Sequence, residues 1–200
     1  MVSTRSSPRS AARPAWSHTP TRLTLLWLAV SLVLVAWDTG YVLLRPHTME
    51  GGFLHKPLWV PYKLYGAVDY VYGWRAWEER NGFTGAQGAM NLVESCLYGA
   101  YLWLWGRGRD ERGAVTGREG GLAVLLGWAA AVMTLSKTML YWLNEYFSGF
   151  DNIGHNPPQT LFFLWIIPNG AWLVLPTYMI YAIGSDILDA FALASRTKDE

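Results

Sequence analysis

The sequence predicts an all-α integral membrane protein, a bundle of four transmembrane helices with an aromatic segment between the first and the second. Three observations predict this fold. Of the 200 residues, 52% are hydrophobic and only 16% are charged. The apolar residues gather in runs long enough to cross roughly 30 Å of hydrocarbon. Many of the 12 Trp and 11 Tyr residues stand at the ends of these runs, where amphipathic rings favour the level of the lipid headgroups.

The four predicted crossings follow from the position and length of the apolar runs, which extend over residues 23–44, 86–105, 122–143 and 160–183. The first run is too long for a removable signal peptide and lacks a small-residue cleavage site at its end. Pro168 and Pro176 lie within the fourth run, which indicates a kinked helix rather than a broken one. We therefore expect residues 22–190 to form one transmembrane domain.

Three segments outside the crossings differ in composition. Residues 1–21 are rich in Ser, Pro and Arg and are predicted to be a disordered tail, and residues 191–200 a short second tail. Residues 53–80 are aromatic and basic and too polar to span a bilayer. An interfacial helical segment and a re-entrant cap over the bundle are both open, and we favour an interfacial segment whose helix begins after Pro61.

The distribution of Lys and Arg predicts the orientation of the chain. Ten of these residues lie in residues 1–22, the 107–118 loop and residues 191–200, and five lie in the connections on the other side. Under the positive-inside rule both termini are cytosolic. The net charge of +1 gives no reason to expect a nucleic-acid partner, and the single cysteine, Cys96, has no disulfide partner.

Several polar residues fall inside the predicted crossings, where an ionised side chain costs on the order of 3 kcal/mol and needs a reason. The acids Asp38 and Glu94 lie in the first and second crossings, and Lys137 lies in the third. In each crossing the polar and aromatic residues recur at intervals of three and four, which places them on one helical face. We expect these faces to surround a shared cavity. In the alternative reading they only hold the helices together, and Lys137 pairs with Asp38 or Glu94 as a structural ion pair.

A cavity of this composition suits the protonation and deprotonation of an alkene. Carboxyls in apolar surroundings can exchange a proton near neutral pH, and aromatic faces stabilise a carbocation where water is excluded. Glu94 and Asp38 are therefore the candidate catalytic residues. The candidate ligand-binding residues are Asn91, Tyr98, Lys137, Tyr141, Asn144, Glu145, Asn169 and Trp172. Cys and His residues at metal-ligand spacing are absent, as are phosphate-binding glycine loops, so we expect no metal and no cofactor.

Several segments resemble the EXPERA domain family, which includes the emopamil-binding protein (the sterol Δ8–Δ7 isomerase) and the sigma-2 receptor. These segments are WDTGYVLL, NLVESCLYGAYLWLW, LYWLNEYFSGF and NGAWLVLP, in that order along the chain. The resemblance covers about residues 25–190, and the stretches HKPLWVPYKLYGAVDY, SKTMLYWLNEY and IIPNGAWLVLP look closest to short fungal members.

The resemblance implies roles for individual residues. Glu94 would be the acid or base of the second helix, Asn169 its hydrogen-bonding neighbour and Trp172 the aromatic face that stabilises a cation. Asp38 stands where the isomerase has Glu, which is similar to the sigma-2 receptor. Two departures concern catalysis: the first-helix His of the isomerase is missing near Leu34, and Lys137 has no counterpart in the isomerase pattern.

Together these observations predict a multi-pass protein of the endoplasmic reticulum membrane that binds a sterol or isoprenoid, with double-bond isomerisation as its candidate activity. Two alternatives stay open. One is a non-catalytic sterol-binding or trafficking protein similar to the sigma-2 receptor. The other is an isomerase or cyclase that acts on a specialised terpenoid or polyketide. The sequence identifies neither the ligand nor the oligomeric state.

Overall fold

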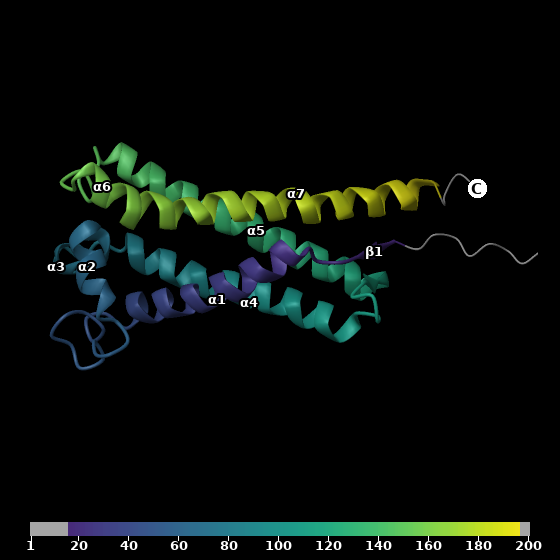
Figure 1. The fold of residues 1–200 in the computed structure, drawn as a ribbon, viewed down its shortest axis with the longest axis horizontal. Coiled ribbons are helices and arrows are strands. Elements are labelled where there is room, and N and C mark those ends of the chain that lie inside the picture. The colour runs from purple at the N-terminus through teal and green to yellow at the C-terminus, as the bar shows by residue number, and fades with distance from the viewer. Residues whose placement is uncertain (1–15, 197–200) are drawn as a thin grey trace, which may run out of the picture.

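The computed structural model describes residues 16–196, and these residues are mostly helical. Within this range four long helical segments run side by side along one bundle (Figure 1). They are α1 (Arg22–Leu43), α4 (Phe83–Gly108), α5 (Gly117–Phe147) and a continuous run made of α6 (Pro158–Leu161), the π-helical turn η2 (Phe162–Ile166) and α7 (Ile167–Arg196).

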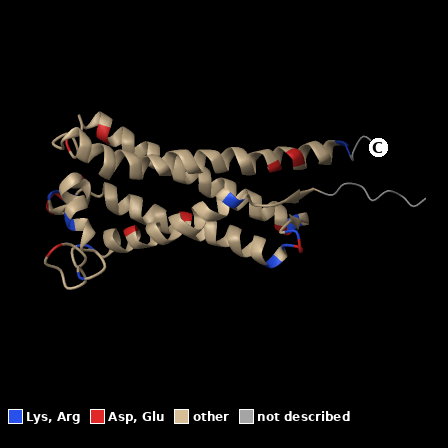
Figure 2. Cartoon of the chain, in the orientation of Figure 1, with Lys and Arg blue, Asp and Glu red and all other residues tan. Residues whose placement is uncertain are grey.

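Three helical segments among the described residues are long and apolar enough to cross a membrane: α1, α5 and the run Pro158–Arg196. Their outer faces expose large apolar side chains such as Leu26, Leu125 and Val174, which suits contact with lipid. Most Lys and Arg residues lie towards the two ends of the bundle (Figure 2). The prediction of a helical, multi-pass membrane protein is therefore confirmed at this level, while the number of four crossings stays a prediction.

The continuous last helix explains how the two prolines are accommodated. Pro168 has no amide hydrogen to donate to the Leu164 carbonyl one turn earlier, and the wider turn η2 lies directly before it. Pro176 lies inside α7 without ending it. The helix is unbroken, as the sequence predicts, and it continues to Arg196. Residues 191–196 of the predicted tail 191–200 are thus helical, their place outside the membrane stays a prediction, and residues 197–200 lie outside the described range.

Close helix packing depends on two glycines of the bundle. A Cβ atom at Gly88 of α4 would lie 2.9 Å from Val42 Cγ1 of α1, and one at Gly127 of α5 would lie 2.9 Å from the ring of Tyr101 in α4. Real Cβ atoms do not approach other atoms so closely, so α4 fits between α1 and α5 only because these positions carry no side chain. The main core then forms from residues of all four long segments, including Leu28, Tyr101, Ala130 and Met179.

The connection between α1 and α4 folds over one end of the bundle, beside α6 (Figure 1). It contains α2 (Pro61–Val68), the short 3₁₀ helix η1 (Tyr70–Tyr72) and α3 (Trp74–Glu78). We call residues 61–78 the cap segment. Its helix α2 begins at Pro61, where a proline favours the first turn of a helix.

At the opposite end, residues 16–21, directly before α1, are ordered rather than disordered. Strand β1 (Ser17–His18) pairs antiparallel with β2 (Val115–Thr116) in the α4–α5 loop. His18 is 2% exposed; its Nδ1 donates to the Asp186 carboxylate of α7 (2.6 Å), and its Nε2 bonds with the Tyr101 hydroxyl of α4 (2.9 Å). The predicted tail 1–21 is therefore wrong for its last residues, because distant helices supply partners that composition does not reveal. Residues 1–15 lie outside the described range.

Replacing His18 tests whether this contact stabilises the bundle. In His18→Ala the Asp186 carboxylate and the Tyr101 hydroxyl each lose a buried partner, and we expect a loss of about 1–3 kcal/mol in the free energy of unfolding. Thermal unfolding of the purified protein in detergent measures the effect. His47→Ala, which changes an exposed histidine at the other end, is the matched control. Equal unfolding temperatures for His18→Ala and wild type would show that the contact does not matter.

Candidate functional site

A cavity of about 440 Å³ lies between the helices, under the cap segment. Leu34 and Leu64 line it and are 40% and 58% exposed, and Pro168 of α7 is also an exposed lining residue, so the cavity is open to the outside. Its walls come from α1, the cap segment, α4, α5, η2 and α7. The lining residues are Leu34, Val35, Trp37, Asp38, Pro61, Tyr62, Leu64, Tyr65, Tyr72, Phe83, Thr84, Gln87, Asn91, Lys137, Thr138, Tyr141, Leu164, Pro168, Asn169 and Trp172.

Seven of the 20 lining residues are aromatic, and several of their rings pack on one another. The Tyr62 ring stacks on Tyr41 with centroids 3.8 Å apart and meets Trp37 edge-on at 4.9 Å. Tyr65 and Tyr72 meet edge-on at 4.9 Å. Such contacts hold each ring in place, so the wall is preformed rather than assembled around a ligand.

Asp38 is the predicted catalytic acid that reaches the cavity. The Tyr62 hydroxyl donates to its Oδ1 (2.7 Å), and the Asn91 side-chain amide donates to its Oδ2 (3.2 Å). The carboxyl is therefore held by neutral donors from the cap segment and from α4. Its position joins α1 to both of these elements.

Glu94, the other predicted catalytic acid, does not line the cavity. Its Oε2 lies 3.1 Å from the Lys137 ammonium, and the two side chains are only 3% and 12% exposed. Lys137 also donates to Oδ1 of Asn91. The structure thus decides between the two possible partners of Lys137: the ammonium faces Glu94 directly and reaches Asp38 through Asn91. A continuous line of polar contacts, Asp38–Asn91–Lys137–Glu94, connects α1, α4 and α5.

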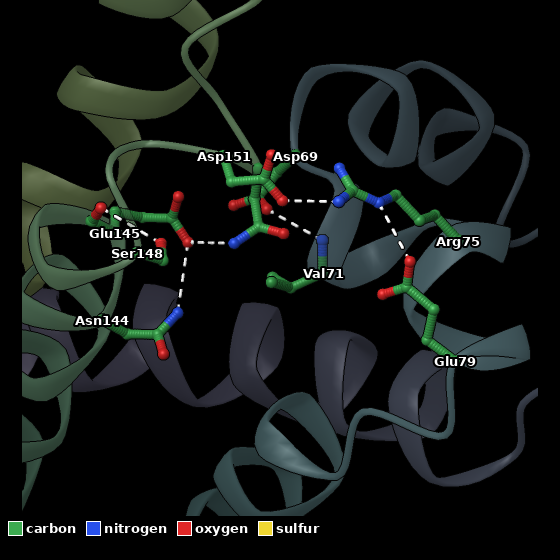
Figure 3. A network of polar contacts seen from close by, with 9 residues as sticks. Asp69, Val71, Arg75, Glu79, Asn144, Glu145, Ser148 and Asp151 are labelled. Atoms are coloured by element: carbon green, nitrogen blue, oxygen red, sulfur yellow. Dashed lines mark hydrogen bonds and ion pairs between the residues drawn. The ribbon is translucent and has the colours of Figure 1, made fainter.

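Three further predicted ligand-binding residues lie away from the cavity. Tyr98 is buried one helical turn after Glu94 in α4, and its hydroxyl bonds with Thr134 (3.1 Å). Glu145 is fully buried and accepts from the side-chain amides of Asn144 (3.3 Å) and Asn152 (2.8 Å) (Figure 3). These residues share a helical face with the cavity residues but lie one turn or more from it along the axis, and a helical repeat gives no measure of that depth.

Tyr141, Asn169 and Trp172 do line the cavity. Asn169 donates to the Tyr65 hydroxyl (3.3 Å) and to the Trp165 carbonyl (2.8 Å), so its hydrogen-bonding neighbour is Tyr65 rather than the expected Glu94. Trp172 meets Trp27 of α1 edge-on, with centroids 5.0 Å apart.

Sequence reasoning missed the contribution of the cap segment. Tyr62, Tyr65 and Tyr72 line the cavity, although the aromatic connection was expected to lie at the membrane interface. The spacing of Tyr62 and Tyr65 by one helical turn is a signal that could have marked an inward face. Asp69 was also missed. It is 0% exposed, and burial raises its pKa to about 6, although hydrogen bonds from Tyr141 and Trp165 act in the opposite direction.

The charged side chains at the capped end form a second, exposed network. Arg75 of α3 donates to Asp151 (2.5 Å) and to Glu79 (3.2 Å), which ties the cap segment to the loop after α5 (Figure 3). Within residues 16–196 no group of three or more His, Cys, Asp or Glu side chains is arranged to hold a metal ion. In comparisons with protein-family models, curated proteins and solved structures, nothing matches this chain.

The ion pair between Lys137 and Glu94 predicts an asymmetric mutational pattern. Lys137→Leu leaves a buried carboxylate without its cation and is expected to destabilise the fold by about 3–5 kcal/mol, seen as a lower yield of monodisperse protein in detergent. The double variant Glu94→Leu/Lys137→Leu removes both charges and should recover much of that loss.

The exposed pair Lys63–Glu50 supplies the matched control for this series, because Lys63→Leu removes a cation whose partner remains in water. We expect Lys63→Leu to express like wild type. A wild-type yield for Lys137→Leu, or a double variant that is worse than the single one, would contradict a stabilising pair.

Proposed function

We propose that this chain is a membrane-embedded binding protein for a sterol or a related isoprenoid. The observation that carries the proposal is the cavity itself. It measures about 440 Å³, is open to the outside, and is lined by seven aromatic residues and by a polar cluster of Asp38, Asn91 and Lys137. Its volume lies within the roughly 300–1,000 Å³ typical of small-molecule pockets. A large apolar body with one small polar group fits this distribution of wall chemistry.

The charges around the cavity favour a neutral ligand. Glu94 is compensated by Lys137, and the Asp38 carboxyl interacts electrostatically with both Lys137 and Arg45. Two acids therefore stand against two cations, which leaves no net charge for an ionic ligand to balance. A hydroxyl group can donate to Asp38 and accept from Lys137 or Asn169, so an alcohol such as a sterol uses both kinds of wall group.

The opening supports access from the hydrocarbon side of the membrane. Leu34 and Leu64 at its rim are apolar and exposed. In our proposal α4 is the fourth crossing: its 26 residues span about 39 Å, and its polar residues face inward. The cap segment then lies at one membrane surface.

The location of the protein also belongs to this proposal. The first described residues and the end of α7 lie at the same end of the bundle, beside the Arg-rich α4–α5 loop (Figures 1 and 2). The positive-inside rule places that end in the cytosol. Residence in the endoplasmic reticulum rests on the resemblance to the EXPERA family, as does the choice of a sterol over other lipids.

Double-bond isomerisation is the second candidate function, and the position of Asp38 in an aromatic cavity favours it. Asp38 would exchange a proton with the alkene, while Trp172 and the tyrosine rings would face the carbocation. We rank binding first for two reasons. Glu94 stands behind Lys137 and does not reach the cavity, and the Lys137 ammonium beside the cavity opposes a second positive charge.

Sterol binding is tested by photo-crosslinking in membranes with a diazirine sterol that carries an alkyne handle. We expect saturable labelling of the wild type that natural sterol competes away. Trp172→Ala and Asp38→Asn should each reduce the labelling strongly, because they remove a wall face and the acceptor for the ligand hydroxyl. Asp189→Asn, an exposed acid far along α7, is the matched control and should label like wild type. Labelling that natural sterol does not compete away would overturn the proposal. So would full labelling of both Trp172→Ala and Asp38→Asn.

Catalysis is tested separately by expression in a yeast strain that lacks its own sterol isomerase. If the chain only binds sterol, Δ8-sterols persist although the protein is present at normal level. Conversion to Δ7-sterols that is lost in Asp38→Asn would instead establish the isomerase function. Sterol analysis by mass spectrometry, with immunoblotting of the membranes, distinguishes the two outcomes.

A further inference from the structure

Asp69 joins three elements behind the cavity wall. It lies between α2 and η1, outside the spanning helices, and is fully buried. The Val71 amide donates to its Oδ1 (3.1 Å), and the Trp165 indole donates to its Oδ2 (2.8 Å). The Tyr141 hydroxyl donates to the same Oδ2. One carboxyl therefore connects the cap segment, α5 and η2 beside the cavity.

All three partners are donors, which suits a carboxylate. An ionised carboxyl accepts only, whereas a protonated one carries a hydrogen on one oxygen and needs an acceptor for it. Protonation of Oδ2 would place its hydrogen against the Trp165 indole N–H, and the Tyr141 hydroxyl would have to change from donor to acceptor to keep its contact with Oδ2. The ring of Tyr141 forms part of the cavity wall, so the state of Asp69 bears directly on the shape and polarity of the cavity.

The surroundings of Asp69 supply no compensating cation. The titratable groups that act on it are Tyr65 and Tyr72 of the cap segment and Tyr141 and Glu145 of α5. Arg45 and His155 approach the cap segment, but they contact the backbone carbonyls of Val71 and Ala67. Within residues 16–196 none of the ion pairs formed involves Asp69. Because no cation holds Asp69 in its charged form, this carboxyl takes up a proton more readily than an ion-paired carboxyl would.

We propose that Asp69 is a positioning residue whose protonation controls the cavity: the carboxylate holds Tyr141 and Trp165 in place, and the protonated acid releases the Tyr141 side chain and weakens ligand binding. The effect on a ligand rests on the proposed function. The effect on Tyr141 and Trp165 does not depend on any ligand.

The pH range of this switch follows from burial, which raises the pKa of Asp69 to about 6. In the unfolded chain the carboxyl titrates near its ordinary value of about 3.9. The contribution of Asp69 to folding stability is therefore full at low pH and falls as the pH rises towards 6. Ligand binding should change in the opposite direction, because it needs the carboxylate. Opposite trends of stability and binding distinguish this switch from simple acid denaturation.

The ligand-independent part is tested by the indole N–H resonance of Trp165 in spectra of detergent-solubilised protein with ¹⁵N-labelled Trp. Trp165→Phe assigns the resonance among the 12 tryptophans. We expect its chemical shift to titrate with a midpoint near the pKa of Asp69. The titration should vanish in Asp69→Asn and should persist in Asp151→Asn, an exposed acid at the same end of the bundle. A Trp165 resonance that does not move between about pH 4.5 and pH 8 would overturn the proposal.

Tyr141→Phe keeps the test decisive if Asp69→Asn does not fold. It retains the carboxyl and removes one of its donors, so the Trp165 midpoint should move to higher pH. An unchanged midpoint would show that Tyr141 and Asp69 are not coupled.

The ligand-dependent part uses a fluorescent sterol and the same protein samples. One pH unit below the midpoint, the apparent Kd should be about tenfold weaker than well above it, because only about one tenth of the protein then carries the carboxylate. Asp69→Asn should bind without this pH dependence. Constant affinity across the midpoint would overturn the control of binding. A protein that binds no sterol at any pH, but whose Trp165 resonance titrates, would overturn the proposed function and leave the Asp69 switch supported.

Discussion

The structure depends on how charges are kept inside a bundle that faces lipid. Glu94 and Lys137 lie 3.1 Å apart, almost fully buried, and Asn91 links Lys137 to Asp38. A charge that leaves water at this depth costs several kcal/mol unless an opposite charge and hydrogen bonds compensate it. These polar contacts therefore determine which faces of α1, α4 and α5 meet. The helix α4 supplies two of these four side chains, and it is not among the three described segments that are apolar enough to cross a membrane.

The cavity exists because the cap segment and the helices fill the capped end incompletely. Tyr62 reaches from α2 to Asp38, and Asp69 reaches from the end of α2 to Tyr141 and Trp165. Hydrogen bonds at two separate points thus hold the cap over the bundle and keep the space below it open. An aromatic wall fixed in this way is preorganised for a rigid, flat ligand more than for a flexible chain, because little of it has to be ordered on binding.

Helix positions and the polar faces were accessible from the sequence because both follow from local patterns. Apolar runs located all four long helical segments, and intervals of three and four residues brought Asp38, Asn91 and Lys137 towards a common space. Depth and pairing were not accessible. The sequence around Glu94 and Asp38 does not show that Glu94 forms an ion pair with Lys137 while Asp38 faces the cavity. The role of His18 depends on Tyr101 and Asp186, which are 83 and 168 residues away in the chain, so composition alone made its segment look disordered.

The two ends of the bundle are built for different tasks. At the end where the described residues begin and α7 ends, β1 pairs with β2, and His18 joins α4 to α7 while Trp16 donates to the Asp186 carbonyl (2.7 Å). Small residues such as Ala123 and Ala130 let the helices approach closely there. At the capped end two smaller apolar clusters, around Val71 and around Met49, pack beside the cavity, and the buried acid Asp69 adds hydrogen bonds between the cap segment and the helices. The end with β1 and β2 therefore holds the helices together, while the capped end leaves the space that the proposed ligand would fill.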